Sequence, residues 1–355
     1  MVDKIIDKSL AGERISVGEG LQLAAEADLY QLGFLADAVK RQKHPEPMVT
    51  YVIDRNINYT DICISACKFC AFFKAPEDKA GYVLTDEELG RKIEETLELG
   101  GTQILLQGGL HPDLPFSYYE ELLRFIKGYG IHIHGFSPPE ICHFAELSGL
   151  SSKEVIQRLQ AAGLDSIPGG GAEILTDRVR KDTAPRKCNT EQWLGVMETA
   201  HTLGMKTTAT MMFGHIETVA ERFEHLERVR TLQERTGGFT AFIPWPFQPA
   251  NTVLSHIPTA TGMEYLRMLA LSRIFLDNVP NIQASWVTQG PKIAQLSLFF
   301  GANDFGSTMI EENVVAAAGV GFRLSEKEIR HLVEDAGFKA CQRRMDYTLV
   351  DKPAK

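Results

Sequence analysis

From about residue 49 onward, short apolar runs alternate with amphipathic helical segments, and this alternation limits the fold more than any other feature. At least seven strand–helix alternations follow one another, at spacings that suit parallel crossover connections. Strands are expected at 49–59, 102–106, 131–136, 165–168, 206–213, 240–244 and 282–287, and helices at 85–99, 116–127, 151–162, 190–203, 219–236 and 262–278. With an eighth strand near 296–300, the pattern predicts an α/β fold, a (β/α)8 TIM-type barrel. A doubly wound open sheet is the alternative.

The two ends of the chain fall outside this repeat. Residues 1–48 have helical periodicity, and a polar stretch with two prolines over residues 40–47 marks a boundary. The barrel is expected over 49–320. Residues 321–355 are expected to form a short C-terminal α/β extension, with a capped helix over 325–336 and a strand over 348–350.

Charge and hydrophobicity exclude several classes of protein. Lys and Arg number 37 against 46 Asp and Glu, so the formal net charge is −9, which opposes binding to nucleic acid or to an anionic membrane. No run of 18 apolar residues occurs, so no membrane span is expected. The N-terminus lacks the apolar region of a signal peptide, which predicts a cytoplasmic protein.

Three of the six cysteines lie within eight residues, just after the first expected strand. Cys63, Cys67 and Cys70 form a C-x3-C-x2-C pattern on a βα loop, and in a barrel such loops form the catalytic face. Thiolates hold iron–sulfur clusters, usually four at a time, so three would leave one iron open. The alternatives are a structural zinc site, three unligated buried cysteines, and a four-cysteine electron-transfer cluster completed by Cys142 or Cys188.

The spacing of this loop, with the aromatic Phe69 before the last cysteine, resembles the signature of the radical S-adenosylmethionine (SAM) superfamily. The resemblance implies a [4Fe-4S] cluster on the three cysteines, with the open iron chelated by SAM. One-electron reduction would cleave SAM to methionine and a 5′-deoxyadenosyl radical, which abstracts hydrogen from an unactivated carbon.

Other loops are similar to the SAM-binding elements of that superfamily. Residues 107–109 resemble its Gly-Gly-Glu turn, although Leu110 stands where that turn has Glu. Residues 210–217 resemble its G-x-I-x-G-x-x-E element beside the adenine, with Glu217 also suited to a structural role. The implied SAM contacts are Phe69, Gln107, Gly108, Gly109, Glu173 (on the ribose), Thr210, Met212 and Gly214. An ordinary turn at 107–109 and a solvent-facing Glu173 are the alternatives.

Strict alternation over residues 131–134 separates isoleucines from histidines. The outer face of a barrel packs on helices and should take the isoleucines, so His132 and His134 are expected to point inward. An inward histidine can bind a ligand oxygen or transfer a proton, and a satisfied core histidine is the alternative. Aromatic and polar loops over 244–249, 286–291 and 301–307 are candidates for the wall of a substrate site.

Five stretches, at 54–60, 107–112, 134–140, 166–173 and 301–306, look like the menaquinone and deazaflavin branch of the superfamily, and the similarity runs from about residue 50 to 320. Residues 166–171 and 286–291 favour the members of that branch that cyclise dehypoxanthine futalosine. The implied reaction abstracts hydrogen from the ribose C4′, after which the carbon radical adds to the attached benzoate ring. A flavodoxin or ferredoxin would supply the electron. The alternatives are aminofutalosine synthase or another enzyme of the same branch, and a non-catalytic iron–sulfur protein.

The sequence gives no unique residue for the remaining steps of such a reaction. The candidate proton acceptors are His134, His111, Glu140 and Asp304. The candidate partners of a substrate carboxylate are Arg55, Ser137 and Asn303.

Overall fold

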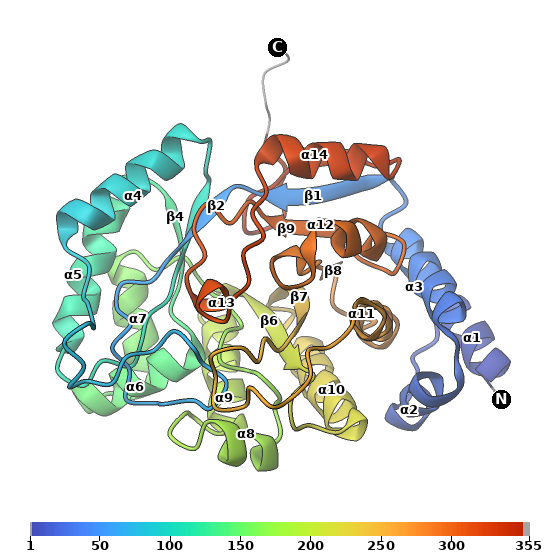
Figure 1. Ribbon diagram of the computed structural model, residues 1–355, viewed down its shortest axis with the longest axis horizontal. Helices are drawn as coiled ribbons and strands as arrows, with labels where there is room; N and C mark the ends of the chain where they lie inside the picture. Colours follow the sequence, from blue (N-terminus) through green and yellow to red (C-terminus); the bar gives the residue numbers. More distant parts are fainter. Residues whose placement is uncertain (1, 351–355) are drawn as a thin grey trace.

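The computed structural model describes residues 2–350 and shows a ring of parallel strands with helices around its outside (Figure 1). Residues 1 and 351–355, at the outer ends of the expected N-terminal segment and C-terminal extension, lie outside the described residues. Seven strands form one parallel sheet in chain order: β2 (Asp54–Ile57), β3 (Gln103–Leu106), β4 (His132–Gly135), β5 (Ser166–Ile167), β6 (Lys206–Phe213), β7 (Phe239–Pro246) and β8 (Asn281–Ile282). A second parallel sheet has the order β10 (Lys339–Gln342), β1 (Met48–Val52), β9 (Asp304–Ser307).

Backbone hydrogen bonds join the two sheets into one closed ring. β1 and β2 are separated by Ile53 alone, and the segment containing β9 runs beside both, with the N–H of Thr308 on the carbonyl of Val52 (3.0 Å). On the other side, the N–H of Ala284, just after β8, donates to the carbonyl of Asp304 (2.9 Å). Counting β1 and β2 as one strand, eight strands close the ring, which confirms the predicted (β/α)8 barrel.

The helices that follow the strands begin at polar caps and end near the residues that periodicity predicts. Thr85, Ser151, Asn189, Thr218 and Thr261 each cap a helix with the reciprocal bonds of a capping box. The helices of the outer layer are α4 (Asp86–Glu98), α5 (Phe116–Lys127), α6 (Pro138–Ser148), α7 (Ser152–Ala162), α8 (Asp177–Thr183), α9 (Thr190–Thr202), α10 (Val219–Thr236), α11 (Gly262–Phe275) and α12 (Trp286–Ser297).

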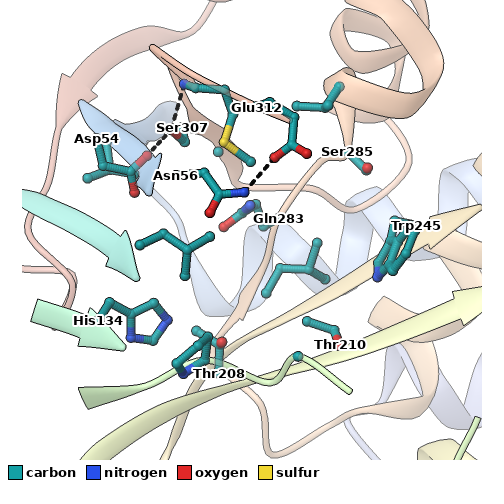
Figure 2. Close-up of a pocket in the computed structure, with 18 of the residues that line it drawn as sticks. Asp54, Asn56, His134, Thr208, Thr210, Trp245, Gln283, Ser285, Ser307 and Glu312 are labelled. Carbon is teal, nitrogen blue, oxygen red and sulfur yellow. Dashed lines mark hydrogen bonds between the residues drawn. The ribbon is translucent and has the colours of Figure 1, made fainter. Parts of the chain in front are cut away.

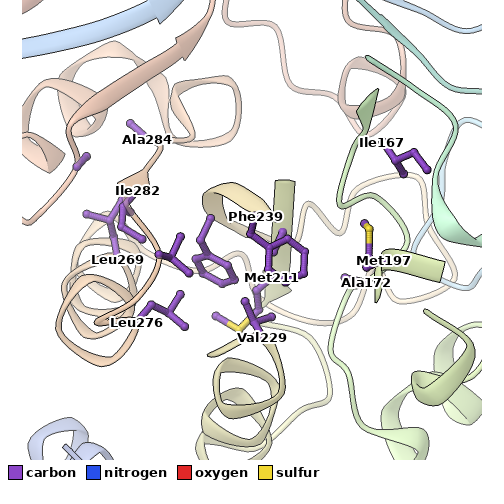
Figure 3. Close-up of a cluster of buried hydrophobic side chains, with 14 of the residues drawn as sticks. Ile167, Ala172, Met197, Met211, Val229, Phe239, Leu269, Leu276, Ile282 and Ala284 are labelled. Carbon is purple, nitrogen blue, oxygen red and sulfur yellow. The ribbon is translucent and has the colours of Figure 1, made fainter. Parts of the chain in front are cut away.

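The main apolar core lies between this outer layer and the outward-facing side chains of the strands. Met211 on β6, Phe239 on β7 and Val229 on α10 pack together there, each fully or almost fully buried (Figure 3). The helices α1 (Val2–Leu10), α2 (Val17–Glu26) and α3 (Leu29–Lys43) lie outside the ring, with α3 packed on α11 (Figure 1). No helix within residues 2–350 is long and apolar enough to cross a membrane.

The eighth strand was predicted in the wrong place. Residues 296–300 form the end of α12 and the turn after it, where Leu298 is fully buried, and the strand is β9 instead. The prediction failed because β9 carries buried polar side chains rather than an apolar run. The strand expected over 282–287 likewise ends at Ile282, since α12 begins at Trp286.

The end of the chain differs from the expectation in one element. The helix α14 (Glu326–Asp335) is capped by Ser325 as predicted, and a short helix α13 (Val314–Ala317) precedes it. The last strand is β10, not residues 348–350, where Leu349 makes only an isolated bridge to Arg343. β10 pairs with β1, so the segment after residue 321 is bonded directly to the first strand.

A buried ion pair joins β9 to the segment after β10. The guanidinium of Arg343 donates from Nε and Nη2 to the two carboxylate oxygens of Asp304, and the Nη2–Oδ1 distance is 3.1 Å. Asp304 has no exposed surface, and it also accepts hydrogen bonds from the Thr50 hydroxyl and the Gly306 N–H. Because both charges are out of water, the loss of either one would leave the other without compensation.

We therefore expect Arg343→Met to destabilise the fold by about 3–5 kcal/mol, the range for breaking a buried ion pair from one side. Urea denaturation of the apo protein measures this loss. Arg344→Met, at the exposed neighbouring position, should change stability by less than about 0.5 kcal/mol. A loss below about 1 kcal/mol for Arg343→Met would contradict the assigned role of the pair.

Candidate functional site

Two adjoining cavities occupy the ring and the carboxyl ends of its strands. The first, of about 250 Å³, is lined by all three clustered cysteines, and we call it the cysteine cavity. The second, of about 280 Å³, is lined by inward-facing strand residues, and we call it the barrel cavity (Figure 2). The residues that line both cavities are Gln107, Gly170, Gly171, Glu173, Trp245, Val314 and Val315.

The cysteine loop leaves β2 and folds so that polar groups lie against its sulfur atoms. The N–H groups of Leu110 and Ser65 donate to Cys63 Sγ at 3.2 and 3.4 Å, and the Ser65 hydroxyl lies 3.2 Å from Cys67 Sγ. Burial raises the pKa of the Cys67 thiol to about 11 and also raises that of Cys70. Donors directed at the sulfurs favour their thiolate form, so this loop fits an iron–sulfur ligand set.

A cation lies beside the same thiols. Lys187 Nζ is 3.0 Å from Glu173 Oε1 and 5.1 Å from the centre of the Phe69 ring. Burial opposes its charge, but the nearby Cys67 and the Glu173 carboxylate together raise the pKa of Lys187 above its usual value. Lys187 therefore stays charged, and it would offset the negative charge that cluster-bound thiolates place at this end of the cysteine cavity.

The glycine turn at residues 108–109 is pressed against the cysteine loop. A Cβ on Gly109 would lie 2.1 Å from the Ile62 carbonyl oxygen, and one on Gly108 would lie 2.5 Å from the Tyr59 ring. Glu140 holds this turn from behind, because its carboxylate accepts from the Gly108 N–H (3.1 Å) and the Tyr59 hydroxyl (2.8 Å). Glycine is therefore required here by close packing within the protein.

The second glycine turn shapes the boundary between the two cavities. Gly169 is held between two side chains of β6, since its N–H donates to Thr208 Oγ1 and its carbonyl accepts from Thr210 Oγ1. Glu173 then turns into the left-handed region, with φ of 41°. That rare conformation for a residue with a side chain points to a constrained position at the wall shared by the two cavities.

The structure places most of the SAM contacts expected from the sequence along these cavities. Thr210 lines the barrel cavity, whereas Gly214 lines neither cavity. Those that line the cysteine cavity are Phe69, Gln107, Gly108, Gly109, Glu173 and Met212. The side chain of Glu217 is fully buried and accepts the Gly214 N–H at 2.6 Å, which gives it the structural role that the sequence left open.

The four candidate proton acceptors are placed differently. His134 lines the barrel cavity, and its Nδ1 lies 2.7 Å from the Ser166 hydroxyl, which is also 2.7 Å from His132 Nε2. Glu140 lines the cysteine cavity, but its oxygens already accept four hydrogen bonds. His111 lines neither cavity. Asp304 also lines neither cavity, and it forms an ion pair with Arg343.

The three candidate partners of a substrate carboxylate are all bonded to other residues of the chain, and of the three only Ser137 lines one of the two cavities, the cysteine cavity. Arg55 faces outward and forms ion pairs with Glu95 and Glu311. The Ser137 hydroxyl donates to Glu140, and the Asn303 amide bonds to Arg273 and Asn281. Alternation along β2 directs Asp54 and Asn56 to the inside instead, so the period of the strand could have excluded Arg55 from the sequence.

Several cavity residues were missed by the sequence analysis. Asp54, Asn56 and Gln103 follow from the alternation of β2 and β3, a signal that was present but was not used. Glu312 and Arg343 gave no local signal, because both reach the barrel cavity from segments outside the βα repeat. Lys187 also lies far from the cysteines in sequence.

Comparisons with known proteins agree with this geometry. Residues 57–229 match the family model described as the Radical SAM superfamily, and residues 236–355 match the one described as the CofH/MqnC C-terminal region. The chain is 47% identical to cyclic dehypoxanthine futalosine synthase of Halalkalibacterium halodurans, over 98% of this chain and 95% of that protein. It is 49% identical to the synthase of the same name from Streptomyces coelicolor, over 99% and 90%.

Two further similarities concern the branch and the fold. The chain is 40% identical to 5-amino-6-(D-ribitylamino)uracil–L-tyrosine 4-hydroxyphenyl transferase of Methanopyrus kandleri, over 98% of this chain and 97% of that protein. Among solved structures, the FeFe-hydrogenase maturase HydG of Carboxydothermus hydrogenoformans superposes with a TM-score of 0.75 at 20% identity, over 98% of this chain and 80% of that one. This structure shares the fold.

The buried histidine at the barrel cavity predicts a pH dependence of stability. Burial lowers the pKa of His134 well below its usual value, so below about pH 6.5 the unfolded chain takes up a proton that the folded chain does not. Stability is then lost as the pH falls. His134→Gln, whose amide can still bond to Ser166, should reduce the loss between pH 7.5 and 5.5 by about 1.4 kcal/mol, measured by urea denaturation. His331→Gln, at an exposed position, is the control; equal pH dependence in wild type and His134→Gln would refute the expectation.

Proposed function

The chain belongs to the radical SAM superfamily, and from that premise we propose that this enzyme converts dehypoxanthine futalosine to cyclic dehypoxanthine futalosine, a step of menaquinone biosynthesis. Two synthases of that name are 47% and 49% identical to the chain over nearly its whole length, against 40% for the transferase of the same branch. In the proposed reaction, hydrogen leaves the ribose C4′ and a bond forms between C4′ and the benzoate ring.

The observation that carries this proposal is the wall shared by the two cavities. A radical formed in the cysteine cavity has to meet its target C–H bond within van der Waals distance, and the two cavities have seven lining residues in common. Trp245 is one of them, and its indole gives the boundary an apolar surface against which an aromatic ring can pack (Figure 2).

Cys63, Cys67 and Cys70 would hold a [4Fe-4S] cluster, and Phe69, Gln107, the two glycine turns and Glu173 would hold SAM beside it. When bound, the cluster and SAM supply the 5′-deoxyadenosyl radical. The residues of the chain have three tasks: to orient SAM, to hold C4′ against the benzoate ring, and to exclude other hydrogen donors. Lys187 supports the first task by fixing Glu173. A flavodoxin or ferredoxin would deliver the electron.

We assign the proton acceptor to His134, the one of the four candidates that lines the barrel cavity. Its Nδ1 is bound to Ser166, and no residue within 2–350 bonds to its Nε2. Burial makes this imidazole a weak base, which suffices because the ring radical left by closure becomes aromatic again when it loses this proton together with one electron, which would return to the oxidised cluster.

A second function of the same branch is favoured by one finding. The transferase of Methanopyrus kandleri is 40% identical over almost the full length of both chains, so the transfer that its name describes is the rival to cyclisation. The two reactions use different substrates on one fold, and a direct comparison of substrates separates them.

We expect anaerobically reconstituted enzyme, given SAM and dithionite, to convert dehypoxanthine futalosine to a product of unchanged carbon skeleton that contains a new ring. Mass spectrometry should show the product two mass units lighter than the substrate, because two hydrogens are lost. Parallel reactions contain tyrosine with 5-amino-6-(D-ribitylamino)uracil, or the enolpyruvyl benzoate used by aminofutalosine synthase. Turnover of either one, without cyclisation, would replace the proposed function.

Substitution of the loop cysteines tests the ligand assignment. Cys63→Ala, Cys67→Ala and Cys70→Ala should each lose most of the reconstituted iron and more than about 1,000-fold of the 5′-deoxyadenosine formation, since a cluster that lacks one thiolate is not retained. Cys341→Ala, on β10 and outside the loop, is the matched control and should keep both. Full iron content in a loop variant would contradict the assignment.

A further inference from the structure

The barrel cavity has a polar wall on β2 and β3 that the proposed chemistry has not yet used. Asp54 and Asn56 on β2 and Gln103 on β3 line the cavity, and at most 5% of each residue is exposed. Ile243 and Trp245 on β7 line the same cavity with apolar surface. Figure 2 shows Trp245 across the cavity from Asp54 and Asn56.

Two buried side-chain amides in this wall donate hydrogen bonds from their nitrogen but have no donor on their carbonyl oxygen. Asn56 Nδ2 donates to Glu312 Oε2 at 2.7 Å, and Gln103 Nε2 donates to Asp54 Oδ2 at 2.7 Å. Within residues 2–350, no group donates to Asn56 Oδ1 or to Gln103 Oε1. A buried acceptor without a donor destabilises the folded protein, so two of them on one cavity wall indicate that a ligand supplies the donors.

The groups around these amides define the chemistry of that ligand. Their partners are the buried carboxyl groups of Asp54 and Glu312, whose pKa values are raised by burial, so the unused positions on this wall are carbonyl acceptors. Arg343 is the cation that lines the barrel cavity, and it is already paired with Asp304. An ionised carboxylate has no donor to offer these carbonyl oxygens, whereas hydroxyl groups would supply the missing donors.

We infer that Asn56, held by Glu312, and Gln103, held by Asp54, form the site that binds the sugar hydroxyls of the substrate. The inference rests on the proposed function, whose substrate carries a ribose at one end and a benzoate at the other. Asn56 Oδ1 accepts a hydrogen bond from a ribose hydroxyl. The carboxylate of the benzoate then points away from this wall, with the ring toward Trp245.

The register of the strands places this sugar site at the level of the proposed proton acceptor. Asn56 is paired in register with Leu105, and Leu105 with His134, so Asn56 and His134 lie in the same layer of the barrel. A ribose held by Asn56 is therefore at the level of the proposed proton acceptor. Glu312 acts through Asn56 as a positioning residue, and its own position is fixed by the Val315 N–H on its Oε1 (2.7 Å).

The test combines single-hydroxyl deletions in the substrate with single substitutions in the protein. Dissociation constants of dehypoxanthine futalosine and of its 2-deoxy and 3-deoxy analogues are measured by calorimetry on wild type and on Asn56→Ala. In wild type, removal of the hydroxyl that donates its hydrogen bond to Asn56 Oδ1 should weaken substrate binding roughly 10- to 100-fold. In Asn56→Ala, removal of the same hydroxyl should change binding less than about 3-fold, because the acceptor is already absent.

Asn281→Ala is the matched control. Asn281 is a buried asparagine of β8 that lines neither cavity, and both ends of its amide are paired, with the Thr240 carbonyl and with Asn303. A variant that only loosens the fold should keep the full effect of the hydroxyl deletion, as Asn281→Ala is expected to do. Thermal unfolding of each variant checks that it is folded at the temperature of the measurement.

The outcomes separate this inference from the proposed function. Suppose that wild-type enzyme forms the cyclised product, but each hydroxyl deletion weakens binding by the same factor in Asn56→Ala as in wild type. The assigned sugar site is then wrong, and the proposed function stands. If wild-type enzyme forms no cyclised product, the proposed function fails, and the inference fails with it. Both the proposed function and the sugar site are supported if wild-type enzyme forms the cyclised product and the weakening caused by one hydroxyl deletion disappears in Asn56→Ala but not in Asn281→Ala.

Discussion

The buried pair between Asp304 and Arg343 is the contact on which the closed interior of the barrel depends. Asp304 belongs to β9, the strand that closes the ring, and Arg343 follows β10, the strand that pairs with the outer edge of β1. The pair therefore ties both edges of β1 together. The guanidinium carbon of Arg343 lies 4.1 Å from the centre of the Tyr347 ring, and both residues line the barrel cavity, so the segment after β10 is part of the wall of the cavity.

The cysteine loop depends on a second set of close contacts, all of them made by segments distant in sequence. Leu110 donates its N–H to Cys63 Sγ only because Gly109 allows its backbone to approach Ile62. Glu140, at the start of α6, fixes the neighbouring Gly108, and Lys187 brings a positive charge to the other side of the thiols. A loop that binds a cluster needs this surrounding shell as much as the cysteines themselves, because the shell sets the charge and the direction of each sulfur.

The sequence predicted those parts of the molecule that have a local pattern. Strand and helix periods located the βα repeat, with α5, α10 and β6 at their observed bounds, and three cysteines in eight residues predicted a site on the loop that lines the cysteine cavity. It failed where stability comes from distant partners. β9 was missed because its buried Asp304 looks unlike a strand residue until Arg343, 39 positions away, is placed beside it. Glu312 and Lys187 were missed for the same reason, since neither lies near the residues it serves.

The register of the strands places the polar wall of the barrel cavity and the residues that line the cysteine cavity at different depths of the same barrel. Asp54 pairs with Gln103 in the lowest layer, Asn56 with Leu105 in the next, and Asn58 follows on the same face of the chain and lines the cysteine cavity. Because alternate residues of a strand share a face, each step of two residues along β2 moves about 7 Å toward the carboxyl end. The acceptors of Asn56 and Gln103 thus lie one and two layers below Asn58, which lines the cysteine cavity. A ligand held in that lower wall presents only its upper part to the cysteine cavity, so the depth of the wall selects which carbon can be reached.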